Sequence, residues 1–139
     1  MKDIQNKVTQ WAARAAATFT PNLCLFYSYL YCAGIGFDTE EDALYEAGKM
    51  LRRGILGKDG AVLDADALLY AYTGRKARVT KQDITSIDGI REKTPVRYNH
   101  NGHSHWVVVE NGKIVFNSVE NSVCTAKGKP ATARIIEWK

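Results

Sequence analysis

The sequence predicts an α+β fold in which N-terminal helices pack on a C-terminal antiparallel sheet. Apolar residues recur at helical spacing through the first half of the chain, whereas short β-rich segments separated by Gly, Asn and Asp fill the second half. Helices followed by strands are typical of α+β domains. The chain of 139 residues shows no repeat, linker or low-complexity tract, so we expect a single domain spanning 1–139.

The first predicted helix covers residues 2–18, where Ile4, Val8, Trp11 and Ala15 recur at helical spacing. A second helix is predicted over 23–33, which is apolar nearly all round and therefore expected to be buried on most sides.

The second helix is expected to start at Thr20 and Pro21 and to stop at Gly34. Threonine is a favourable N-cap, and proline suits the first helical position because its missing N–H has no partner there. This start would place Cys24 a few residues inside the helix.

Two more helices follow. The acidic run Asp38-Thr39-Glu40-Glu41 opens the third, which ends at Arg52 and Arg53, where the helix dipole favours cations. Asp64 is a suitable N-cap for the fourth helix, Ala65 to Tyr72, and Gly74 ends it.

The second half contains five predicted strands, at about 76–80, 94–98, 104–110, 113–119 and 131–138. Glu110-Asn111-Gly112-Lys113 predicts a hairpin between the third and fourth of them. A two-residue turn would place Ser118 opposite His105, whereas a three-residue loop would place Asn117 there, and only the loop would bring an amide beside the imidazole. Asn followed by Gly fits either turn.

Cys24 and His105 are the candidate catalytic pair. A thiol in the first turns of a helix feels the positive end of the dipole, which favours the thiolate, and a histidine is needed to take its proton. Free cysteine is also among the most buried residues, so packing is the alternative for Cys24, and a strand-end histidine bonded to backbone is the alternative for His105.

These residues resemble the papain-like cysteine peptidases. The resemblance rests on a cysteine near the start of a long buried helix, a late His105-Trp106-Val107-Val108-Val109 strand and a polar residue on the next strand. Among compact bacterial branches the chain is most similar to the double-glycine-leader (bacteriocin-processing) peptidases, and more distantly to NlpC-type cell-wall peptidases. Parts of it also resemble an uncharacterised spirochaete and phage-associated family.

The resemblance implies a papain-like fold and a cysteine hydrolase that cleaves a peptide or amide bond through a thioester, without a cofactor. Cys24 would be the nucleophile, His105 the general base and Asn117 the residue that orients the imidazole, with Glu120 or Asn121 as alternatives for that role. Its partner would be a peptide or protein substrate.

The chain departs from the papain-like pattern at two places. Thr18 stands where these enzymes generally carry a glutamine that stabilises the oxyanion, and Cys24 is followed by Leu25 where the leader peptidases commonly have glycine. The alternative function is therefore a catalytically inactive papain-like domain that binds a peptide or partner protein.

The composition and the N-terminal stretch indicate the expected location of the protein and the state of its cysteines. No apolar run has membrane length, and the N-terminal stretch lacks the apolar core of a secretory signal, so we expect a cytoplasmic protein. Three cysteines without CxxC spacing predict free thiols, with Cys32 in the core and no role for Cys124.

Neither metal nor nucleic acid has a strong signature. His103 and His105 with a cysteine offer zinc ligands, but their spacing matches no common zinc pattern, so no metal is expected. The basic run Arg75-Lys76-Ala77-Arg78 has few aromatic neighbours, so nucleic acid is not an expected partner at a net charge of +4.

Overall fold

The computed structural model describes residues 23–119 and 123–139, and within them it has four helices and a five-stranded antiparallel sheet. The α+β class predicted from the sequence is therefore confirmed. The helix predicted over 2–18, with Thr18, Thr20 and Pro21, lies outside the described residues, as do Glu120 and Asn121.

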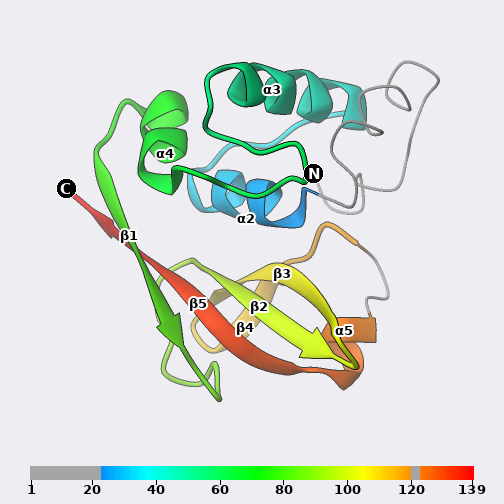
Figure 1. The fold of residues 1–139 in the computed structure, drawn as a ribbon. Coiled ribbons are helices and arrows are strands. Elements are labelled where there is room, and N and C mark those ends of the chain that lie inside the picture. The colour runs from blue at the N-terminus through cyan, green and yellow to red at the C-terminus, as the bar shows by residue number, and fades with distance from the viewer. Residues whose placement is uncertain (1–22, 120–122) are drawn as a thin grey trace.

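The helical layer contains α2 (Cys24–Cys32), α3 (Glu40–Arg52) and α4 (Ala65–Thr73). Figure 1 shows that α2 lies between α3 and the sheet. This position agrees with the nearly all-apolar sequence of α2, in which Phe26, Tyr27 and Leu30 have no exposed surface.

Side chains and glycine set the ends of the other two helices. The Thr39 hydroxyl accepts the N–H of Asp42 at the start of α3, and the Asp64 carboxylate accepts the N–H of Ala67 at the start of α4. Gly74 ends α4 with a φ of 68°, a left-handed conformation that glycine adopts without strain. These two capping hydrogen bonds confirm the predicted starts of α3 and α4.

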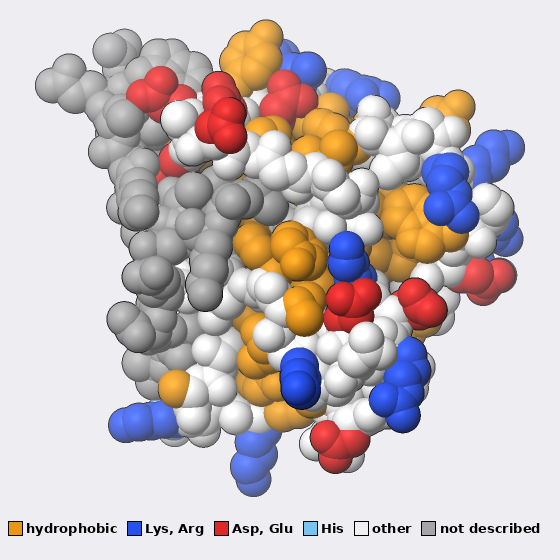
Figure 2. All heavy atoms as spheres, turned by 180° about the vertical axis from the view of Figure 1, so that it is seen from behind, with side chains coloured by type: hydrophobic (Ala, Val, Ile, Leu, Met, Phe, Trp, Pro, Cys, Tyr) orange, Lys and Arg blue, Asp and Glu red, His pale blue; other side chains and the backbone are white. Residues whose placement is uncertain are grey.

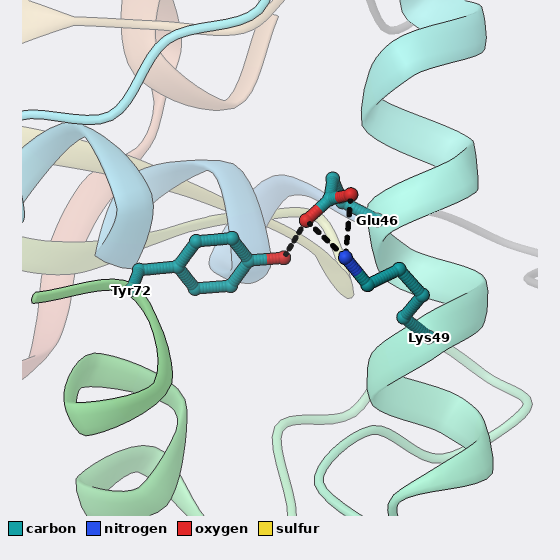
Figure 3. A network of polar contacts seen from close by, with 3 residues as sticks. All are labelled: Glu46, Lys49 and Tyr72. Carbon is teal, nitrogen blue, oxygen red and sulfur yellow. Dashed lines mark hydrogen bonds and ion pairs between the residues drawn. The ribbon is translucent and has the colours of Figure 1, made fainter. Parts of the chain in front are cut away.

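A polar contact joins α3 to α4 at the surface. The hydroxyl of Tyr72 donates to a carboxylate oxygen of Glu46 at 3.0 Å, and Lys49 forms an ion pair with the same carboxylate at 3.1 Å (Figure 3).

The sheet has the strand order β1-β5-β2-β3-β4. The strands are β1 (Ala77–Asp83), β2 (Thr94–His100), β3 (His103–Glu110), β4 (Lys113–Phe116) and β5 (Lys129–Trp138). Each overlaps a predicted strand, but β4 ends three residues before its predicted end.

Two tight hairpins set the register of the centre of the sheet. Asn111 and Gly112 have φ values of 52° and 72° between β3 and β4, and Asn101 and Gly102 have 48° and 80° between β2 and β3. Positive φ at both central residues defines the hairpin turn that Asn-Gly favours. The second turn pairs His100 with His103 and thereby starts β3 two residues before His105.

The centre of the sheet is buried on both faces. Val108 and Phe116 face the helical layer and pack in the main core. Val107 and Val109 face the opposite side and form a smaller cluster with the segment 84–90 and with Cys124 of α5 (Val123–Lys127). No sequence pattern predicts α5. This short helix lies against β2 and β3 and covers the end of the second face.

Candidate active site

Cys24 is the first residue of α2, with Leu23 as the N-cap. The helix therefore begins at the cysteine, and its predicted start at Thr20 and Pro21 is wrong. The backbone N–H groups of Trp106 and Leu25 lie close enough to the sulfur to stabilise negative charge on it. The first N–H groups of a helix have no partner within it, so a side chain at this position can use them.

The Cys24 thiol is only 3% exposed. Burial raises its pKa above the usual value, while the nearby backbone N–H groups act in the opposite direction and only reduce the shift. The resting sulfur is therefore a protonated thiol, and the thiolate predicted from the helix dipole is wrong for this state.

His105 lies on β3, on the face of the sheet that α5 covers. Side chains alternate along a strand, so His105 shares this face with Val107 and Val109. The residue is 7% exposed, and burial lowers the pKa of its imidazole below 6.5, against a smaller opposing effect of its hydrogen bond with Asn117. The imidazole is consequently neutral at neutral pH and available as a base.

Asn117 determines which ring nitrogen of His105 carries the proton. Its Oδ1 lies 2.7 Å from Nε2 of His105, and it also accepts the backbone N–H of Val119 at 3.1 Å. A backbone N–H can only donate, so the atom that faces both groups must be the amide oxygen. The neutral ring therefore donates from Nε2, and its Nδ1 is left as the proton acceptor.

The hairpin brings Asn117 to His105 by a route that differs from both predicted turns. The turn has two residues, because Glu110 pairs with Lys113 and Val109 with Ile114. The register then shifts so that Val108 pairs with Phe116, which leaves Val115 as an extra residue. The expectation that only a three-residue loop places an amide beside the imidazole is wrong, because this bulge and the end of β4 redirect the chain.

The short helix α5 supports Asn117 from the other side. Nδ2 of Asn117 donates to Oγ1 of Thr125 at 3.4 Å. The N–H of Gly128 closes α5 by bonding the carbonyl of Cys124. A Cβ at Gly128 would overlap the carbonyl oxygens of Cys124 and Asn99, so the end of α5 packs directly on the backbone of β2. Glycine is thus required at this close approach, and Gly128 is the sequence signal that marks it.

The three predicted residues come from different layers, and the elements that carry Cys24 and His105 begin at one end of the molecule. Figure 1 shows the start of α2, the start of β3 and α5 at this end. The Cys24 sulfur bonds the amide of Trp106, the residue that follows His105, and it lies close enough to Cys124 of α5 for their charges to interact. The helical layer supplies the thiol, and the opposite face of the sheet supplies the imidazole and its amide partner.

The remaining histidines and cysteines lie apart from this constellation. His103 is exposed, and His100 accepts from Asn101 at 3.2 Å. Cys32 packs against the main core, where burial raises the pKa of its thiol to about 12. Across the described ranges, no three His, Cys, Asp or Glu side chains gather closely enough to hold a metal ion.

Within residues 23–119 and 123–139, no helix has the length and apolar character needed to cross a bilayer. Comparisons with family models, with curated proteins and with solved structures give no match.

Proposed function

We propose that this protein is a papain-like cysteine hydrolase that cleaves a peptide or amide bond. The observation that carries the proposal is the 2.7 Å hydrogen bond between His105 and Asn117, together with a cysteine at the start of a buried helix whose sulfur contacts the amide of Trp106, the residue after His105. An oriented base next to a nucleophile is the arrangement that thiol-dependent acyl transfer requires.

The protonation states of Cys24 and His105 determine the order of steps in the proposed reaction. Nδ1 of His105 takes the proton of Cys24 as the sulfur attacks the substrate carbonyl carbon. The imidazolium then protonates the leaving amine, the C–N bond breaks, and a thioester remains on Cys24. A water molecule that loses its proton to Nδ1 attacks the thioester, which releases a carboxylic acid and restores the thiol.

The neutral resting forms of Cys24 and His105 are consistent with this order of proton transfers. Burial disfavours both the thiolate and the imidazolium, so proton transfer accompanies attack and no ion pair is present beforehand. The N–H groups of Trp106 and Leu25 near the sulfur stabilise negative charge as it develops there.

Cleavage of a degenerate peptide library, followed by mass spectrometry of products and protein, tests the proposal. The wild-type protein should release products and carry an acyl adduct on Cys24 that hydroxylamine removes. Cys24→Ser and His105→Ala should abolish both signals, whereas Cys32→Ser, which alters a thiol away from the site, should retain them. Cleavage that survives Cys24→Ser would exclude Cys24 as the nucleophile.

The second candidate is an inactive papain-like domain that binds a peptide or partner protein. The 3% exposure and raised pKa of the Cys24 thiol favour it, as does Thr18 at the position of the usual glutamine. This candidate predicts that wild-type protein and Cys24→Ser bind the same library members with equal affinity and that neither cleaves them.

A further inference from the structure

A concave region lies between α4 and the start of β1, away from the candidate active site. It has a volume of about 570 Å³ and is lined by Asp66, Ala67, Tyr70, Lys76, Ala77, Arg78 and Lys139. We call it the α4–β1 pocket. In Figure 1, α4 and the start of β1 lie at the opposite end of the molecule from α5.

The α4–β1 pocket has an excess of positive charge. Lys76, Arg78 and Lys139 line it against the single carboxylate of Asp66, which accepts the N–H of Val79 at 2.9 Å. Arg78 faces Glu137 across the β1–β5 ladder, yet none of the three cations forms an ion pair with any residue in the described ranges. These ammonium and guanidinium groups therefore retain the capacity to bind an external anion.

The pocket also offers apolar surface. The side chain of Tyr70 is 52% exposed, and Ala67 and Ala77 contribute small apolar side chains beside it. Figure 2, viewed from behind, shows Lys and Arg side chains around hydrophobic ones on the side of the molecule where α4 and β1 lie. A ligand that combines an apolar group with flanking negative charge would match both features.

We propose that the α4–β1 pocket binds an acidic peptide segment, with an apolar side chain against Tyr70 and carboxylates at the basic residues. The carboxylates of Asp66 and Glu137 interrupt the positive surface and disfavour a continuous phosphate backbone. Stacked bases would find few aromatic faces, since Arg75 already covers the Trp138 ring at 5.1 Å. A peptide therefore fits this surface better than nucleic acid, and the inference does not depend on the proposed hydrolase activity.

Fluorescence anisotropy with a labelled peptide of glutamates interrupted by leucines tests this site. Binding should weaken as salt rises and fall at least about tenfold in Lys76→Glu/Arg78→Glu, since two attractive charges become repulsive. Tyr70→Ala should also weaken binding. Lys58→Glu, an exposed charge reversal outside the pocket, should leave the affinity unchanged, and thermal melting checks that each variant is folded.

Three outcomes would overturn the proposal: no binding of the acidic peptide by the wild-type protein, equal binding of its glutamine-for-glutamate counterpart, or tighter binding of a single-stranded RNA through the same basic residues. Each can be observed in Cys24→Ser protein as well, so the result does not depend on whether the candidate active site is functional.

Discussion

Nε2 of His105 donates a hydrogen bond to Oδ1 of Asn117, and the N–H of Val119 holds the same oxygen in place. One backbone amide thus determines which ring nitrogen of His105 carries the proton. This relationship can be tested without a substrate.

We expect the neutral imidazole of His105 to be the Nε2–H tautomer, which ¹⁵N chemical shifts of labelled protein can show directly. Asn117→Ala removes the acceptor, so the ring should then populate both tautomers. His103→Gln, which changes an exposed histidine on the same strand, is the control and should leave the His105 signals unchanged. An Nδ1–H tautomer in the wild-type protein would contradict the assignment.

If the proposed chemistry holds, Asn117→Ala should also slow acylation of Cys24 by about 10- to 100-fold. The reason is the loss of an oriented hydrogen bond, which contributes about 1.4–2.8 kcal/mol at this rate difference. Mass spectrometry of the acyl adduct against time measures the rate. An unchanged rate would exclude Asn117 as the orienting residue.

The protein should lose stability as the pH falls below 6.5. Burial holds the pKa of folded His105 below 6.5, so the unfolded chain binds a proton in this range that the folded chain does not bind. The free energy of unfolding should therefore fall with a slope of up to about 1.4 kcal/mol per pH unit from this group. Urea unfolding of wild-type protein and His105→Gln measures the difference, with the exposed His103→Gln as control.

Cys24 should react slowly with iodoacetamide at neutral pH, because burial raises the pKa of its thiol and leaves it 3% exposed. The measurement uses Cys32→Ser/Cys124→Ser, in which Cys24 is the one remaining thiol of the sequence. Its rate should rise when the protein is unfolded in urea. Alkylation that is faster in the folded than in the unfolded protein would contradict the raised pKa.

Two leucines in the same region should differ sharply in their contribution to stability. Leu69 of α4 has no exposed surface, so Leu69→Ala should lower the free energy of unfolding by about 2–5 kcal/mol. Leu63, which is 64% exposed, is the matched control, and its replacement by alanine should cost less than about 1 kcal/mol. Equilibrium urea unfolding compares the two.

Gly128→Ala should destabilise the protein by about 1–3 kcal/mol or more, since the added methyl group overlaps two backbone carbonyls. Gly89→Ala adds the same group where no atom lies within 4 Å, so it should change stability by less than about 1 kcal/mol. If the two variants unfold at the same urea concentration, the packing of α5 on Asn99 is wrong.

Much of the fold could be predicted because local chemistry determines it. The caps at Thr39 and Asp64, the stop at Gly74 and the Asn111-Gly112 turn each act within a few residues, so the sequence shows them directly. The start of α2 was misplaced because Thr20 and Pro21 suit a helix start better than Leu23, which caps α2 without a side-chain hydrogen bond.

The arrangement of the site depends on contacts that the sequence does not display. No local pattern shows that Val115 is an extra residue in β4 or that α5 packs on Asn99. The protonated state of Cys24 depends on how deeply the helix is buried. Burial raises the pKa of the thiol by more than the nearby N–H groups lower it. Cys24, His105 and Asn117 could be named from the order of residue types along the chain, but their mutual geometry could not.

The extra residue in β4 sets two demands against each other. A regular ladder that kept Val115 would pair it with Val108 and would exchange the faces of all that follows, sending the amide of Asn117 to the side of the sheet away from His105. The bulge leaves Val115 without a partner in the ladder, so that Phe116 still pairs with Val108 and Asn117 stays on the face of His105. Sequences that keep both the Asn-Gly turn and the asparagine should therefore tolerate a change of residue type at this position, or its loss, because both leave Phe116 opposite Val108.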